Sequence, residues 1–154
     1  MVTLKILLPY NFTTYDGKAL DFVIKTFARQ KEARITLFNT YTTIPELDIK
    51  ESPVLARMRG GMVSLIAELK DKEAGLKSTK GILLENGFSD EQIDYIFKKR
   101  VKPIGDEIIE TAAKGRYRVI VLSRQPGKTT RLFARSVHNK VLSVLKDVTV
   151  CIAV

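Results

Sequence analysis

The residues best suited to bind an anion lie within residues 117–145. An apolar run at residues 119–122 is followed by a short loop and then by apolar residues at helical spacing from 132 to 145. Arg131 precedes this helix, and Arg124 and Lys128 lie in the loop. This pattern predicts a buried strand, a loop and the start of a helix. Free N–H groups and the positive dipole at a helix N-terminus attract anions, and the three cations would add to that attraction. The stretch therefore predicts a phosphate-binding site.

The N-terminal part of the sequence predicts elements that would position this loop. Residues 2–8 read as a first strand that Pro9 ends, and the capping pair Thr13 and Asp16 marks the start of a helix. Residues 34–40 are rich in β-formers and read as a second strand. The helical connection between the two strands is long enough for a parallel crossover.

A long helix is predicted next, starting near Val54 and ending at Asn86. We expect a break between Gly75 and Gly81, because glycine is unfavourable inside a helix. The face predicted to point inward is apolar and consists of Leu55, Met58, Met62, Leu65, Ile66 and Leu69.

Residues 89–98 support two interpretations. Ser89 and Gln92 form a capping box typical of a helix, whereas apolar and polar residues alternate at 93–98 as in a strand. We favour the strand, because residues 103–114 already read as a helix opened by a proline and closed by a glycine. The chain then alternates strands and helices. This order predicts an α/β fold with a five-stranded open parallel sheet, helices on both faces, and ligands at the carboxyl ends of the strands.

The composition predicts one domain spanning residues 1–154, of which 45% are hydrophobic and 28% charged. No apolar run approaches the roughly 20 residues that span a bilayer, and the N-terminus lacks the features of a signal peptide. We therefore expect a cytoplasmic protein without membrane contact. Cys151 is the single cysteine and is expected to be a buried strand thiol.

The net charge of +9 is concentrated near the C-terminus. From Lys114 onward nine basic residues stand against one acid, Asp147. A basic surface of this kind favours anionic partners, whether nucleotide phosphates, nucleic acid or an acidic protein. The charge alone leaves these alternatives open.

Several stretches of the sequence together resemble the universal stress protein family. They are a strand ending in proline followed by a helix (residues 5–24), a second strand (33–41), a late strand–loop–helix unit (116–142) and a final apolar strand (148–154). The resemblance covers nearly the full length. It implies a five-stranded α/β sandwich, a homodimer formed through residues 148–154, and in many members a bound ATP.

The resemblance also implies a set of nucleotide-binding residues, with departures from the family pattern. Asn11 stands where the nucleotide-binding members carry an aspartate, and Thr40 where they carry an apolar residue. Two glycine positions fall on Ser123 and Pro126, or on Leu122 and Gln125, and Arg135 replaces the last glycine, so backbone approach to phosphates is restricted. The implied site for ATP or another adenine nucleotide comprises Pro9, Tyr10, Asn11, Thr40, Ser123, Arg124, Gly127, Lys128, Thr129, Ser136 and Val137.

Other signals for catalysis are weak. Gly127, Lys128 and Thr129 imitate the end of a P-loop, but the glycine required five positions earlier is Leu122. His138 has no partner in sequence spacing and is expected to be a surface or packing residue. Three acids near the start of the helix at 103–114, Asp106, Glu107 and Glu110, are expected to complement its dipole.

We therefore expect no catalytic residues, no metal site and at most a weak ATPase. The expected function is that of a nucleotide-binding or signalling module in stress response. The alternatives are an interaction module of the same fold that binds no nucleotide, and nucleic-acid binding through the basic C-terminal third.

Overall fold

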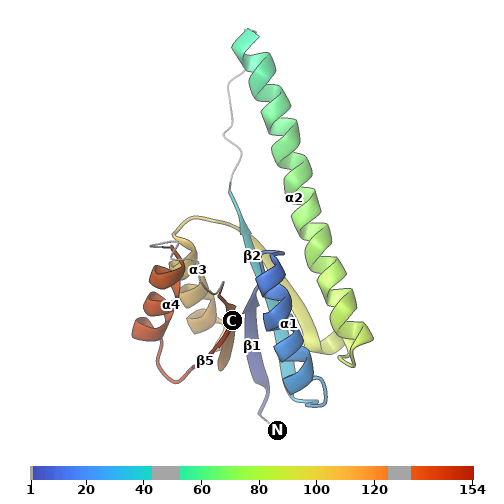
Figure 1. Cartoon of the computed structure of the whole chain (residues 1–154), viewed down its shortest axis with the longest axis vertical. Coiled ribbons are helices and arrows are strands. Elements are labelled where there is room, and N and C mark those ends of the chain that lie inside the picture. The colour runs from blue at the N-terminus through green and yellow to red at the C-terminus, as the bar shows by residue number, and fades with distance from the viewer. Residues whose placement is uncertain (1, 43–52, 125–132) are drawn as a thin grey trace.

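The computed structural model describes residues 2–42, 53–124 and 133–154 (Figure 1). Five strands alternate with four helices, and a short 3-10 helix, Asp90–Gln92, precedes the third strand. The strands are β1 (Leu4–Pro9), β2 (Ala33–Tyr41), β3 (Ile93–Lys99), β4 (Val119–Ser123) and β5 (Thr149–Ala153). The helices are α1 (Thr14–Phe27), α2 (Pro53–Glu85), α3 (Ile104–Lys114) and α4 (Phe133–Val144). This order of elements confirms the predicted alternation of strands and helices.

All five strands pair in parallel in the order β3-β2-β1-β4-β5. Strand β1 is therefore the central strand. Strands β2 and β3 lie on one side of it and β4 and β5 on the other, so the strand order reverses between β1 and β4. In parallel sheets of this kind, ligands bind beyond the carboxyl ends of the strands at this reversal of strand order. The predicted fold class, a five-stranded open parallel sheet with helices on both faces, is confirmed.

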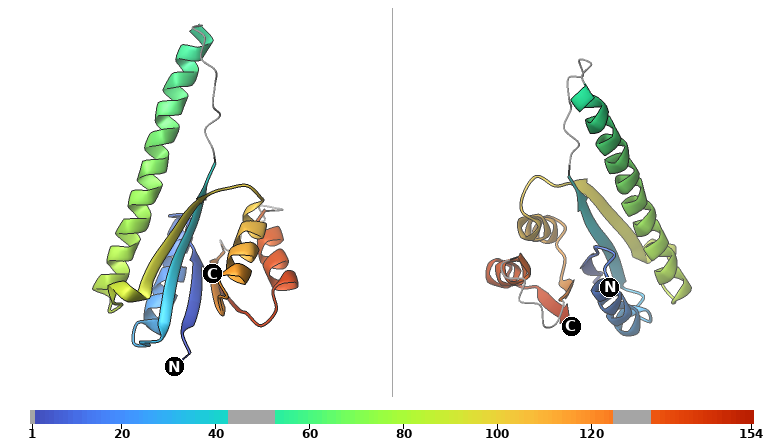
Figure 2. Two further views of the ribbon diagram at one scale, coloured as in Figure 1. Left: turned by 180° about the vertical axis from the view of Figure 1, so that it is seen from behind. Right: turned by 45° about the horizontal axis from the view of Figure 1, so that its top comes forward.

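Alternate residues of the central strands point to opposite faces of the sheet, and each face has its own core. Ile6 and Leu8 of β1 pack in one core with residues of α1 and α2, whereas Leu7 packs in the other with residues of α3 and α4. All three side chains are fully buried. Figure 2 shows the two helical layers on either side of the sheet. Burial on both faces explains why the central strands read as continuous apolar runs.

Residues 89–99 combine the two interpretations that the sequence allowed. Ser89 and Gln92 form the expected capping box around the 3-10 helix, and β3 begins directly after it. The amide of Gln92 also donates two hydrogen bonds of 3.0 Å, to the carbonyls of Gln30 and Ala33. The capping residues thus attach the start of β3 to the start of β2, and the predicted strand is confirmed.

Helix α2 differs from the prediction in two respects. It is unbroken from Pro53 to Glu85, so the predicted break is wrong. Leu76 and Leu83 are fully buried against the sheet, and this packing outweighs the low helix propensity of glycine.

The predicted inward face of α2 is also wrong in part. Leu65 and Ile66 are 39% and 42% exposed, because this part of the helix extends beyond the carboxyl ends of the strands (Figure 1). The side chains of Leu55, Met58 and Met62 lie outside the described residues.

Among the described residues no helix is both long enough and apolar enough to cross a bilayer.

Two glycines, Gly115 at the end of α3 and Gly81 in α2, differ in the space around them and give a matched test of local packing. A Cβ at Gly115 would overlap Cε2 of the Tyr117 ring, whereas a Cβ at Gly81 in α2 would meet nothing within 4 Å. We expect Gly115→Ala to lower the free energy of unfolding by about 1–3 kcal/mol through overpacking. Gly81→Ala should instead raise it by about 0.5–1 kcal/mol, since alanine favours the helix. Urea unfolding of both variants tests this, and changes of the same sign would contradict it.

Candidate nucleotide-binding site

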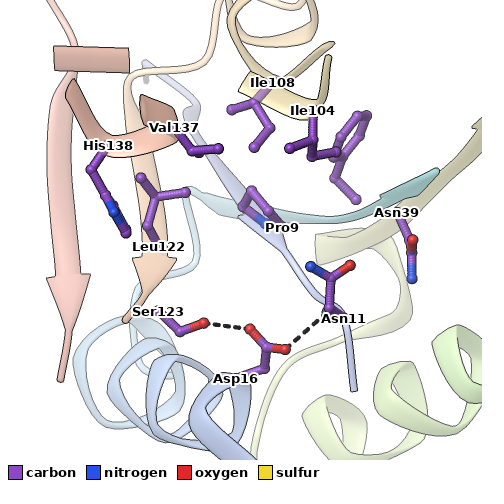
Figure 3. A pocket seen from close by; sticks show the side chains of 11 residues that line it. Pro9, Asn11, Asp16, Asn39, Ile104, Ile108, Leu122, Ser123, Val137 and His138 are labelled. Carbon is purple, nitrogen blue, oxygen red and sulfur yellow. Dashed lines mark hydrogen bonds between the residues drawn. The ribbon is translucent and has the colours of Figure 1, made fainter. Parts of the chain in front are cut away.

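A cavity of about 240 Å³ lies at the carboxyl ends of β1, β2 and β4, at the reversal of strand order (Figure 3). The ends of the strands contribute its floor, and the starts of α1 and α3 with one turn of α4 contribute its walls. It is lined by Pro9, Asn11, Asp16, Phe38, Asn39, Ile104, Ile108, Leu122, Ser123, Val137 and His138. The sheet topology therefore brings residues from six elements or their ends to one place.

Asp16 is the centre of the hydrogen bonds at this cavity. Its carboxylate is only 4% exposed. Oδ2 accepts hydrogen bonds from the backbone N–H of Asn11 (3.0 Å) and of Thr13 (3.1 Å) and from the Thr13 hydroxyl (2.8 Å). Oδ1 accepts one from the Ser123 hydroxyl at the end of β4 (Figure 3). Asp16 thus caps α1 and also joins the ends of β1 and β4.

The remaining lining residues divide into apolar walls and a few polar groups. Ile104, Ile108, Leu122 and Val137 supply apolar surface, and the side chains of Asn11, Asn39 and His138 supply hydrogen-bonding groups (Figure 3). Among the described lining residues there is one carboxylate and no lysine or arginine. An apolar cavity with a few polar groups and one carboxylate suits a ring system bearing hydroxyl groups.

Four of the residues implied by the sequence line the cavity: Pro9, Asn11, Ser123 and Val137. Val137 comes from α4, which begins at Phe133 and directs its N-terminus toward the same end of the sheet. The side chain of Ser136 lies outside the described residues, and so do Gly127, Lys128 and Thr129 entirely.

Three other implied residues lie elsewhere. Tyr10 packs against the core under α1 and α2, with its ring 5.2 Å from that of Phe12. Burial, and then the charge of Asp16, raise the pKa of Tyr10. Thr40 is buried and its hydroxyl accepts a hydrogen bond of 2.9 Å from Nε of Arg100. Arg124 is exposed and does not line the cavity.

Sequence reasoning missed Asp16, Asn39 and the two α3 isoleucines as cavity residues. Asp16 was visible only as half of a capping pair, and Asn39 only as the residue before Thr40. The available signal was their position near strand ends: Asn39 lies near the carboxyl end of β2, and Asp16 lies in the first turn of the helix that follows β1. His138, expected to be a surface or packing residue, is half-buried and lines the cavity.

The acids of α3 do not line the cavity but make specific contacts with residues around the helix. Glu107 is 1% exposed and accepts hydrogen bonds of 2.9 Å from the backbone N–H groups of Val101 and Lys102, while its Oε2 lies 2.6 Å from Nζ of Lys98. Burial raises the pKa of Glu107, but Lys98 and the two N–H groups outweigh it and lower the pKa overall.

The neighbouring acids of α3 pair with surface lysines. Glu110 pairs with Lys102 and Lys114, which lower the pKa of its carboxyl to about 2. Asp106 pairs with Lys140 of α4. In the described part of the chain no group of three or more His, Cys, Asp or Glu side chains could hold a metal ion.

Comparison with known proteins decides the family. The profile of the Universal stress protein family matches residues 3–151. The chain belongs to this family. A search of curated protein sequences found no significant match.

Solved structures of universal stress proteins share the fold. UspA from Lactobacillus plantarum is 14% identical, with a TM-score of 0.69 over 100% of this chain and 99% of that one. The Archaeoglobus fulgidus protein, in complex with dAMP, is 16% identical, with a TM-score of 0.62 and full coverage of both chains. An Arabidopsis thaliana family member with AMP bound is 15% identical, with a TM-score of 0.53 over 97% of this chain and 90% of that one.

Proposed function

We propose that this universal stress protein binds an adenine nucleotide in the cavity between the ends of β1 and β4, and acts as a cytoplasmic stress-response module through binding rather than catalysis. The observation that carries the proposal is the position and lining of the cavity. It lies at the reversal of strand order and combines apolar walls with Asn11, Asn39 and Asp16. Relatives of the same fold carry AMP and dAMP, which supports an adenine nucleotide as the ligand.

The charges of the cavity suggest how the nucleotide is oriented. The Asp16 carboxylate would repel a phosphate but accept hydrogen bonds from ribose hydroxyls. We therefore place the nucleoside beside Asn11 and Asp16. The phosphates would lie toward Ser123 and the N-terminus of α4, where free N–H groups favour an anion. The resemblance to the family implies the same role, contact with the phosphates, for Gly127, Lys128, Thr129 and Ser136.

Titration of nucleotide-free protein with AMP, dAMP and ATP tests this proposal. We expect one site per chain, and Asn11→Ala should weaken binding about five- to tenfold, as expected for loss of one hydrogen bond. The matched control is Asn86→Ala, an exposed asparagine at the end of α2 that does not line the cavity. Equal affinity of the two variants would refute the assignment of the site. Binding that falls steeply with salt and shows no preference among bases would instead favour nucleic acid.

One observation favours a second function, an interaction module that binds no nucleotide. The cavity of about 240 Å³ is smaller than the roughly 300–1,000 Å³ typical of small-molecule sites. Two of its polar groups, the Asn11 N–H and the Ser123 hydroxyl, already donate to Asp16. Absence of binding heat with all three nucleotides would favour this function.

We also propose a homodimer formed through residues 148–154. Strand β5 is at the edge of the sheet, and Ile152 and Val154 are 39% and 62% exposed. Pairing with a second copy would cover this apolar edge and its free backbone groups. We expect Ile152→Lys to give monomers in light scattering, whereas Val2→Lys, an exposed valine outside the strand, should leave the dimer intact. A monomeric parent protein would refute the proposal.

A further inference from the structure

A second concave surface lies at the opposite end of the sheet from the nucleotide cavity. It is a groove of about 450 Å³ between the C-terminal ends of α3 and α4, beside the amino ends of β4 and β5. The two helices lie next to each other on one face of the sheet (Figure 1). The groove is lined by Ile109, Ala112, Ala113, Arg116, Tyr117, Arg118, Val144, Leu145, Lys146, Asp147 and Val148.

The lining of this groove is amphipathic. Seven of the eleven residues are aliphatic or aromatic, including Ile109, Tyr117 and Leu145. The other four are charged: Arg116, Arg118 and Lys146 are cations, and Asp147 is the one acid. All four charged side chains are exposed. The groove therefore has an apolar wall and a cationic rim with a net charge of +2.

The three cations of the rim have no ion-pair partner among the described residues. Other lysines of the same helices are paired, as Lys114 is with Glu110 and Lys140 with Asp106. Three cations with only one acid, Asp147, beside them repel one another, so an anion bound between them would be favourable.

A role at the helix C-termini does not account for these cations. Cations often bind the free backbone carbonyls at a helix C-terminus, but carbonyls at the end of α3 already accept hydrogen bonds from other donors. Nζ of Lys5 donates a hydrogen bond of 2.6 Å to the carbonyl of Gly115. The backbone N–H groups of Gly115, Arg116 and Tyr117 donate to the carbonyls of the last turn. The guanidinium groups of Arg116 and Arg118 therefore remain available at the groove.

The backbone holds two rim residues in an unusual conformation. Arg116 and Asp147 have φ values of 53° and 58°, in the left-handed region that glycine usually occupies at helix ends. Aspartate is among the residue types that adopt this region most readily, but a long side chain such as that of Arg116 is uncommon there, and such positions occur more often at functional sites.

We propose that this groove binds a free small-molecule anion with an apolar body, such as a medium-chain carboxylate. The volume of about 450 Å³ is within the range of small-molecule sites. The carboxylate would pair with Arg116, Arg118 and Lys146, and the apolar body would cover Ile109, Leu145 and the neighbouring apolar residues. This site is separate from the nucleotide cavity and does not depend on it.

Amide chemical shifts of the full-length protein, titrated with octanoate, test the proposal. We expect saturable shifts centred on the groove residues. Acetate has the charge without the apolar body, and 1-octanol has the apolar body without the charge, so each should bind at least tenfold more weakly. Acetate or octanol binding as tightly as octanoate would overturn the proposal, as would shifts centred elsewhere.

Variants distinguish binding in the groove from nonspecific attraction to the positive charge of the protein. Arg116→Gln combined with Lys146→Gln should weaken octanoate binding at least tenfold, and Ala113→Phe, which fills the groove from an exposed helical position, should weaken it similarly. The control Lys114→Gln removes a cation of the same helix end that does not line the groove and should change affinity less than twofold. Equal losses in the control and in the double variant would refute the site. If one of the two groove variants fails to fold, the other is sufficient to test the proposal.

Discussion

Replacement of Asp16 by alanine is expected to lower the free energy of unfolding by about 3 kcal/mol. Loss of a helix N-terminal cap costs about 0.5–2 kcal/mol. Partly buried donors left without an acceptor cost about 1–2 kcal/mol more, toward the lower end of the range for buried donors. Four donors would lose their acceptor, including the Asn11 N–H and the Ser123 hydroxyl. Because Asp16 also joins the ends of β1 and β4, the variant should bind adenine nucleotides more weakly than the parent protein.

Asp21→Ala is the matched control for Asp16. Asp21 lies on the same helix, and its side chain is 57% exposed and pairs with Lys25 at i,i+4. Exposed pairs of this kind contribute about 0.3–0.5 kcal/mol, so the control should change stability little. Urea unfolding and nucleotide titration of both variants provide the comparison. Similar stability for the two variants would mean that Asp16 does not hold the cavity together.

Replacement of Glu107 by alanine is the second large expected effect, a loss of about 3 kcal/mol at neutral pH. Removal of one member of a buried charge pair costs about 3–5 kcal/mol. We expect the lower end of that range because Lys98 is 38% exposed and can regain water. The N–H groups of Val101 and Lys102 would also lose their acceptor at the turn that precedes α3.

The lowered pKa of Glu107 makes this contribution depend on pH. Its stabilisation is present above the unfolded-state pKa of about 4.3 and is lost as the pH falls through the lower folded-state value. The stability difference between the parent protein and Glu107→Gln should therefore be largest at neutral pH and shrink below pH about 4. Urea unfolding across this range is the measurement, with the exposed Glu32→Gln as control. A difference that stays constant with pH would contradict the assignment.

Much of the fold could be predicted from local patterns. Continuous apolar runs such as residues 119–122 indicate strands buried on both faces, and the pairs Thr13/Asp16 and Ser89/Gln92 mark where helical turns begin. These signals lie within a few residues of one another, so the order of elements and the parallel sheet follow from them. Local patterns did not place ligand-binding residues: the resemblance to the family implied Pro9, Asn11, Ser123 and Val137, and these four residues line the cavity.

The contacts that build the cavity join residues far apart in the chain. Asp16 meets Ser123 across 107 residues, and this contact exists only because β1 and β4 are neighbours in the sheet. Periodicity does not encode strand order, so the sequence indicates that Asp16 and Asn39 lie near strand ends but not that they line one cavity. The continuity of α2 through Gly75 likewise depends on packing against the sheet rather than on helix propensity.

Local sequence thus determined the type and order of the elements, because hydrophobic period and capping act over a few residues. Tertiary packing decided which side chains face each cavity. Lys5 and Gly115 are 110 residues apart, and their hydrogen bond leaves Arg116 free beside the groove. Such combinations arise from the folded arrangement of the whole sheet, since long-range contacts are fixed only when every strand and helix has found its neighbours.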